Sequence, residues 1–95
     1  MSFLVEENPA RRRFEILVDD ALAGFTEYVP RGEVLVFTHT QVDERYQNMG
    51  VGSALIGGTL DQIRERGGRI VTQCEFMTRF IQRHSEYADL VVAEP

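Results

Sequence analysis

Alternation of apolar and polar residues in the first half of the chain predicts two neighbouring β-strands. Residues 11–18 alternate along their length, and residues 21–29 form a second run of strand-forming residues. Asp19-Asp20 alone separates the two runs, so we expect a hairpin with this pair as its turn. Residues 1–10 lack such a pattern and are expected to be an N-terminal tail.

A third strand and a long helix follow. Residues 30–32, Pro-Arg-Gly, are a strong turn signal before residues 33–42, whose apolar positions fall on both faces, as in a central strand. From Gly50 the apolar residues recur every three to four positions, which predicts a helix. Gly67-Gly68 is a typical stop signal for that helix.

The remaining residues complete a single small domain. Residues 69–74 predict a short strand, and residues 75–84 predict a second helix. A strand, a helix and a strand in one sheet imply a right-handed crossover with parallel strands. The predicted fold class is α+β, an α/β sandwich in which an antiparallel three-stranded meander precedes a helix, a parallel strand and a second helix. Residues 11–95 are expected to form this domain.

The composition narrows the classes of function. The 95 residues carry a formal net charge of -5, from 15 acidic and 10 basic side chains, which argues against a generally basic nucleic-acid-binding protein. Cys74 is the only cysteine, so a disulfide framework and a cysteine-rich zinc site are excluded, and no metal is expected. No apolar run approaches the roughly 20 residues of a membrane span, and acids and Pro9 stand where a signal peptide would be apolar. We therefore expect a cytoplasmic protein without nucleic-acid or membrane partners.

A glycine-rich segment lies between the predicted central strand and the first helix. Gln47-Asn48-Met49-Gly50-Val51-Gly52 places glycines at a helix start, where backbone N–H groups have no partner within the helix and the helix dipole attracts anions. The segment predicts either a pyrophosphate site or an ordinary turn. The lysine of a P-loop and the third glycine of a dinucleotide fingerprint are missing, which argues against those two classes.

The same segment carries a resemblance to a known family. Gln47-x-x-Gly50-x-Gly52 resembles the (Gln/Arg)-x-x-Gly-x-(Gly/Ala) signature of the GCN5-related N-acetyltransferases, and it lies where that family has it, between a strand and a helix. The chain is more closely similar to very small stand-alone members of the family, over about residues 14–92. The motifs that carry this closer similarity are Gly24-x-x-x-Tyr28, Thr38-His39-Thr40-x-Val42, Gly50-Val51-Gly52-Ser53-x-Leu55, Cys74-x-Phe76 and His84-x-Glu86-Tyr87.

The resemblance implies acetyl-CoA as the co-substrate. Its pyrophosphate would lie on the amides of the glycine-rich loop. Its pantetheine arm would lie where the strand ending near Val42 diverges from the strand ending at Cys74, with the thioester carbonyl at main-chain donors of residues 40–42. Gly57 and Gly58, in the middle of the helix, leave room for a neighbouring helix or for the adenosine. The residues expected to bind the coenzyme are Thr40, Gln41, Val42, Arg45 (the arginine nearest to the loop, for the 3′-phosphate), Gln47, Asn48, Met49, Gly50, Val51, Gly52 and Ser53.

Cys74 and His39 are the candidates for proton chemistry. Cys74 ends a strand and precedes a helix, and the resemblance implies a catalytic role there, as general base, transient acetyl acceptor or acid toward the leaving thiolate. The alternative is a buried small hydrophobic residue. His39, expected on the strand face that carries Phe37 and Gln41, is either a base for an ammonium substrate or a structural histidine. If His39 and Cys74 are neighbours, a Cys-His relay follows.

The leading hypothesis is an acetyl-CoA-dependent N-acetyltransferase that moves the acetyl group from the coenzyme thioester to an amine. Full-size members wall the acceptor site with an N-terminal strand and two helices, for which this chain has no room, so a large or protein-borne acceptor is favoured. The first alternative is a non-catalytic acyl-CoA-binding regulatory module, because the helix after Cys74 lacks the tyrosine that protonates coenzyme A in many members. The second is a small α+β interaction domain without a coenzyme.

Overall fold

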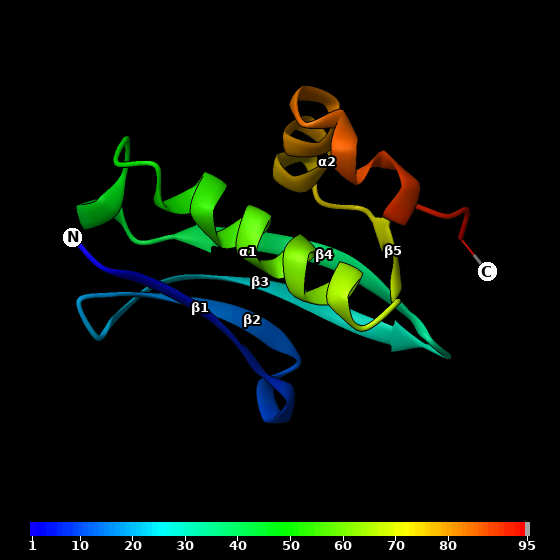
Figure 1. The fold of residues 1–95 in the computed structure, drawn as a ribbon. Helices are drawn as coiled ribbons and strands as arrows, with labels where there is room; N and C mark the ends of the chain where they lie inside the picture. Colours follow the sequence, from blue (N-terminus) through cyan, green and yellow to red (C-terminus); the bar gives the residue numbers. More distant parts are fainter. Residues whose placement is uncertain (95) are drawn as a thin grey trace.

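The computed structural model describes residues 1–94, which form one sheet covered on one face by two helices. The strands, in the order β1-β2-β3-β4-β5 across the sheet, are β1 (Phe3–Asn8), β2 (Arg13–Val18), β3 (Ala21–Arg31), β4 (Val34–Val42) and β5 (Arg69–Thr72), the helices are α1 (Val51–Glu65) and α2 (Glu75–Arg83), and the 3-10 turns are η1 (Pro9–Arg11), η2 (Glu44–Tyr46) and η3 (Ser85–Leu90). Helix α1 lies across the sheet and α2 lies beyond it, after β5 (Figure 1). None of the helices in residues 1–94 has the length and apolar character needed to cross a membrane.

The N-terminal residues form a strand, so the prediction of a tail was wrong, and so was the expectation that the chain has no room for an N-terminal strand. β1 pairs antiparallel with β2 along its whole length, from Phe3 opposite Val18 to Asn8 opposite Arg13. The antiparallel part of the sheet therefore has four strands rather than three. The sequence hides this strand because its short apolar run is followed directly by two glutamates, as in a solvated tail.

The predicted hairpin and crossover are confirmed. Asp19 and Asp20 have φ angles of 48° and 72°, and a type I′ hairpin turn requires positive φ at both central residues. β4 pairs with β5 in parallel, and α1 connects the two strands. The region from β4 to β5 is therefore the β-α-β unit that the periodicity predicted.

An irregularity between β3 and β4 decides which β4 side chains face the helices. Tyr28 pairs with Phe37 and Glu27 pairs with His39, so Thr38 is an extra residue in β4, a β-bulge. Phe37 is completely buried in the core, whereas His39 is exposed. The prediction that His39 shares a face with Phe37 was wrong, because the bulge interrupts the alternation on which it was based.

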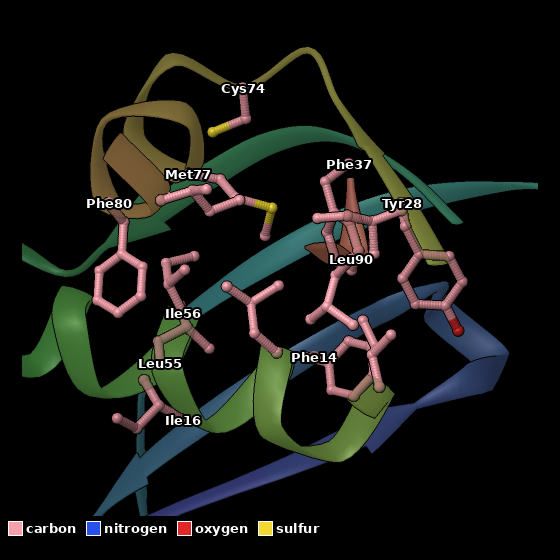
Figure 2. Packing of buried hydrophobic residues seen from close by; sticks show 14 of the residues in the cluster. Phe14, Ile16, Tyr28, Phe37, Leu55, Ile56, Cys74, Met77, Phe80 and Leu90 are labelled. Carbon is pink, nitrogen blue, oxygen red and sulfur yellow. The ribbon is translucent and has the colours of Figure 1, made fainter. Parts of the chain in front are cut away.

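The core lies between the helices and the sheet face beneath them (Figure 2). Helix α1 approaches β1 closely at Gly58, where a Cβ atom would lie 2.7 Å from Val5 Cγ2. A Cβ at Gly57 would lie 3.6 Å from Phe80 Cζ of α2, an ordinary contact. The close approach of β1, the strand that was not predicted, therefore explains why a glycine stands at Gly58. Large core side chains include Phe14, Ile16, Tyr28, Phe37, Leu55, Ile56, Met77, Phe80 and Leu90.

Candidate functional site

The last residues of β4 extend beyond its pairing with β5, and we call the space beside this free edge the opening. The parallel pairing ends where Phe37 lies opposite Thr72, and the Gln73 N–H then donates to the Phe37 carbonyl at 2.8 Å. β4 continues to Val42, whereas the chain turns into α2 after Cys74. The two strands therefore diverge, as the resemblance predicted.

Backbone N–H groups of β4 point into this opening. The Asp43 N–H donates to the Ala23 carbonyl of β3 at 2.8 Å. Because backbone groups alternate sides along a strand, the N–H groups of Thr40 and Val42 point the other way, toward the opening. On the same side, the Val42 carbonyl accepts a hydrogen bond from Gln47 Nε2 at 3.0 Å, which fixes the start of the following loop.

The loop before α1 presents a second group of amides. Gly50 is the N-cap of α1 with a φ of 77°, and no side chain caps this helix. The N–H groups of Val51, Gly52 and Ser53 therefore have no partner within the helix. A hollow of about 300 Å³, the loop hollow, lies over them. It is lined by Val42, Tyr46, Gln47, Asn48, Gly50, Val51, Gly52, Ser53, Phe76 and Arg83.

Four of the predicted coenzyme-binding residues lie outside the loop hollow. Thr40 borders the opening instead, and Met49 is 43% exposed. Gln41 contacts His39, on the sheet face that the helices do not cover. Arg45 forms a bidentate ion pair with Asp43, and these hydrogen bonds hold the pKa of the Asp43 carboxyl below its ordinary value. The arginine expected to bind a phosphate is therefore held by a neighbouring carboxylate.

Cys74 lies beside the opening, at the N-cap of α2. Its Sγ donates a hydrogen bond to Thr40 Oγ1 at 3.2 Å, and that hydroxyl lies 2.9 Å from the Thr26 hydroxyl. The Cys74 side chain is only 7% exposed and belongs to the edge of the core (Figure 2). Cys74 is therefore packed at the edge of the core and contacts β4 beside the opening.

His39 does not contact Cys74. Adjacent side chains on a strand point to opposite faces, so His39 points away from the cysteine that Thr40 contacts. Its Nε2 lies 3.4 Å from Gln41 Oε1, and its ring centroid lies 6.1 Å from that of Phe25. The structure does not bring His39 and Cys74 together, so the predicted Cys-His relay is not formed.

A second hollow, the α1–α2 hollow, has a volume of about 360 Å³ and adjoins the first. The two hollows share Ser53, Phe76 and Arg83. Residues 75–84 were predicted only as a second helix, so this surface was not expected. The signal that could have revealed it is the spacing of Arg79 and Arg83, one helical turn apart just after the predicted cleft. The hollow is lined by Ser53, Glu75, Phe76, Arg79, Phe80, Arg83 and His84.

Tyr87 of η3, which lies outside the helix after Cys74, forms a hydrogen bond with α1. Its hydroxyl donates to Asp61 of α1 at 2.7 Å. This hydrogen bond, together with burial, raises the pKa of Tyr87 to about 12. The phenol therefore serves as a contact between η3 and α1. Within residues 1–94, no cluster of three or more His, Cys, Asp or Glu side chains has an arrangement suited to a metal ion.

A family model described as GCN5-related N-acetyl-transferase matches residues 13–90 of this chain. The chain therefore belongs to the GCN5-related N-acetyltransferases, a family whose membership implies the use of acetyl-CoA. The resemblance and the fold class predicted from the sequence are both confirmed. No curated protein matches the chain.

Solved structures show the same fold. A GCN5-like protein from Staphylococcus aureus matches with a TM-score of 0.69 at 18% identity, over 97% of this chain and 90% of that protein. Ard1 from Thermoplasma volcanium matches with a TM-score of 0.59 at 24% identity, over 77% of this chain. Ribosomal-protein-alanine N-acetyltransferase from Brucella melitensis biovar Abortus 2308 matches with a TM-score of 0.58 at 20% identity, over 87% of this chain. The chain spans only 53% and 62% of these last two proteins.

Proposed function

We propose that the protein transfers the acetyl group of acetyl-CoA to a large or protein-borne amine. The observation that carries this proposal is the opening between β4 and β5 next to an uncapped helix start. Thr40 and Val42 offer amides along the opening, and α1 offers amides at its end. An extended thioester followed by a pyrophosphate matches these two groups of donors in that order.

The two groups of backbone amides, on β4 and at the start of α1, each fit one part of acetyl-CoA. The pyrophosphate fits the amides of Val51, Gly52 and Ser53, where the α1 dipole favours an anion and Arg83 adds positive charge. The pantetheine amides fit the free edge of β4, as an added strand would. When bound, the coenzyme supplies the activated acetyl thioester. The chain's amides at Thr40 and Val42 orient its carbonyl and favour negative charge on the carbonyl oxygen.

We assign proton exchange at this site to Cys74. Its sulfur is hydrogen-bonded to Thr40, the residue whose amide points into the opening, and it lies at the N-terminus of α2. That place suits a proton carrier between the amine or the departing coenzyme thiol and the protein. His39 has no such role in the proposal, since its ring lies on the other face of the sheet with Phe25.

The preference for a large acceptor follows from the open surroundings of the site. Both helices lie on one face of the sheet, and the opposite face carries exposed side chains such as Leu22 and His39. A small amine needs a pocket that buries most of its surface, whereas a protein-borne amine brings its own surface to cover the site. These observations support an acceptor presented on a peptide or a protein.

Release of coenzyme A thiol from acetyl-CoA, measured with peptides that carry N-terminal or lysine amines, tests the proposal. Cys74→Ala is expected to lower turnover on the best peptide by about 100-fold, the usual contribution of a proton-transfer group. His39→Ala is expected to retain most of the activity. An equal loss in both variants would contradict the assignment of proton exchange to Cys74.

Gly50→Ala tests the loop hollow, with Gly67→Ala as its matched control. Both glycines have positive φ, 77° and 68°, and a Cβ atom at either position would meet no atom within 4 Å. Both variants are therefore expected to lose a similar stability, about 1 to 2 kcal/mol, measured by urea unfolding. Only Gly50→Ala is expected to weaken acetyl-CoA binding, by about tenfold in calorimetry. Equal affinities in the two variants would contradict a pyrophosphate site at this loop.

One observation favours a second function, a non-catalytic acyl-CoA-binding regulatory module. Cys74 is almost fully buried, so its sulfur has little room to meet a substrate. Binding of acetyl-CoA without turnover on any acceptor would favour this module. Failure to bind acetyl-CoA at all would overturn both functions and leave an interaction domain.

A further inference from the structure

The face of the sheet opposite the two helices, here called the uncovered face, has the features of a docking surface. We propose that it binds a polypeptide segment of the acceptor protein that carries basic side chains around an apolar one. The inference rests on the proposed function in one respect, because it takes the bound protein to be the acceptor. It adds a recognition surface that is separate from the amides assigned to the thioester and the pyrophosphate.

The register of the four antiparallel strands places the side chains of the uncovered face in three rows. Along β2, Phe14, Ile16 and Val18 are buried in the core, so the residues between them point to the uncovered face. Residues directly opposite them on neighbouring strands point the same way. The first row is Leu4, Leu17 and Leu22, the second is Glu6, Glu15, Phe25 and Gln41, and the third is Asn8, Arg13, Glu27 and His39.

The first row gives the uncovered face an exposed apolar strip. Leu4 is 52% exposed and Leu22 is 44% exposed, and Leu17 lies between them. Next to Leu22 is a hollow of about 110 Å³, the β3–β4 hollow, which is too small for most small-molecule ligands, whose sites take about 300 Å³ or more. It has room for one apolar side chain of a partner. The hollow is lined by Leu22, Ala23, Gly24, Phe25, Gln41 and Asp43.

The charges of the uncovered face favour a basic partner. Arg13 is already engaged, since its Nε lies 2.8 Å from the Glu15 carboxylate and its guanidinium lies 4.4 Å over the Phe25 ring. Glu6 and Glu27 form no ion pair with any side chain of residues 1–94. These two carboxylates lie on β1 and β3, two strand spacings or about 10 Å apart. The uncovered face therefore offers two separate sites for cationic side chains.

The position of the uncovered face beside the opening indicates why its partner is the acceptor protein. Gln41 lines the β3–β4 hollow and stands between Thr40 and Val42, whose amides point into the opening. A polypeptide held on this face keeps its amines at a high effective concentration near the opening. Nucleic acids and anionic membranes are repelled by the same carboxylates, and a second copy of the chain would bring like charges together. A basic polypeptide is the occupant that the charges fit.

Binding of a peptide that has no acceptor amine tests the uncovered face independently of catalysis. The probe is an N-acetylated peptide with arginines around one leucine and no lysine, and its control has glutamine in place of each arginine. NMR spectra of the isotope-labelled full chain are expected to show shifts in amides of β1 to β4, with the arginine peptide bound about fivefold more tightly. Equal affinity for the two peptides, or shifts confined to the helices, would overturn the inference.

The proposed function is tested separately by thiol release from acetyl-CoA. If the arginine peptide does not bind but acetyl transfer occurs, the inference fails and the proposed function stands. If the peptide binds to the uncovered face but no amine is acetylated, the proposed function fails. The bound protein is then not an acceptor, which overturns that part of the inference.

The ratio of the two peptide affinities in charge variants assigns the ionic contacts. Glu6→Gln combined with Glu27→Gln is expected to bring the ratio from about five to about one. Glu65→Gln combined with Glu86→Gln removes the same charge from exposed positions on α1 and η3, so the ratio of the unmodified protein should persist. An unchanged ratio in the Glu6 and Glu27 variant would overturn the assignment of the basic side chains to this face.

Leu22→Ser tests the apolar contact, with Val91→Ser as a control at a similarly exposed position, 37% against 44%. Leu22→Ser is expected to weaken both peptides about fivefold, whereas Val91→Ser should leave both affinities unchanged. Equal effects of the two variants would overturn the role of the β3–β4 hollow. Sedimentation of the unmodified protein should show a monomer. A dimer that dissociates in Leu22→Ser would assign the uncovered face to a second copy and overturn the inference.

Discussion

Gly57 and Gly58 are neighbours on α1, yet they meet different surroundings. At Gly58, an added Cβ would lie 2.7 Å and 2.9 Å from two side-chain carbons of Val5 on β1. At Gly57, the nearest atom would be Phe80 Cζ at 3.6 Å. A side chain added at Gly58 would therefore clash with Val5. At Gly57 it would have room, so a substitution there would change mainly the conformational preference of the helix.

We expect Gly58→Ala to destabilise the protein and Gly57→Ala to stabilise it. Overpacking against Val5 should cost about 1 to 3 kcal/mol in the free energy of unfolding and exceed the gain in helix propensity. Gly57→Ala should gain up to about 1 kcal/mol, because alanine favours the helix and fits the space. Urea unfolding at neutral pH measures both. Adding Val5→Ala to Gly58→Ala should recover part of the loss, and no recovery would mean that β1 is not the obstacle.

Two tyrosine–carboxylate hydrogen bonds join elements at the two ends of the chain to the rest of the domain. Tyr28 of β3 donates to Glu7 of β1, and Tyr87 of η3 donates to Asp61 of α1. Burial and the Glu7 hydrogen bond raise the pKa of Tyr28 to about 12. The Asp61 hydrogen bond and burial raise the pKa of Tyr87 to about 12. Both phenols must stay protonated to keep these contacts.

The raised pKa values predict a loss of stability at alkaline pH. A group whose pKa is higher in the folded state stabilises the fold fully below its unfolded value, here 10.0, and loses that contribution as pH rises toward about 12. We therefore expect the free energy of unfolding to fall between these pH values. Tyr28→Phe and Tyr87→Phe should each flatten this dependence of the free energy of unfolding on pH. Urea unfolding at several pH values across the range measures it. An unchanged slope in both variants would contradict the role of these hydrogen bonds.

At the scale of elements, the periodicity of apolar residues predicted those strands and helices that local sequence patterns determine. The β2–β3 hairpin, the crossover through α1 and the helix after Cys74 all leave a regular spacing of apolar residues or a turn signal. β1 and the bulge at Thr38 leave no such signal, because pairing partners far along the chain decide them. The bulge had the larger consequence, since it moved His39 to the face opposite Cys74.

At the scale of the whole molecule, the candidate site is assembled from segments that the sequence separates. The glycine-rich loop was predicted because its residues are contiguous and carry a known signature. Arg83 and Phe76 reach the same hollow from α2, and only the packing of α2 beside the start of α1 places them there. Contact between Phe76 and Gly52 illustrates this, because a Cβ on Gly52 would lie 2.6 Å from Phe76 Cζ. The second glycine of the signature thus also makes room for a helix.

The formal net charge of -5 affects the two substrates in opposite ways. Acetyl-CoA is an anion, so under the proposed function local amides such as those of the loop hollow must bind it against the overall field. An amine acceptor is a cation near neutral pH, so the same field attracts it. The effect is long-range, and salt weakens it beyond a Debye length of about 8 Å at 0.15 M.

We therefore expect a basic peptide to be a better acceptor than a neutral one with the same reactive amine. Its KM should rise several-fold between about 0.05 M and about 0.5 M salt, because screening weakens attraction before contact, while kcat stays constant. The neutral peptide, measured at saturating acetyl-CoA, should show little change in KM over the same range. A salt effect of equal size on both peptides would instead indicate that salt weakens acetyl-CoA binding or destabilises the fold. Better turnover of a small polyamine than of either peptide would contradict the proposal of a large acceptor. The field attracts a small polyamine as well, so its better turnover would mean that the site does not need the surface of a peptide.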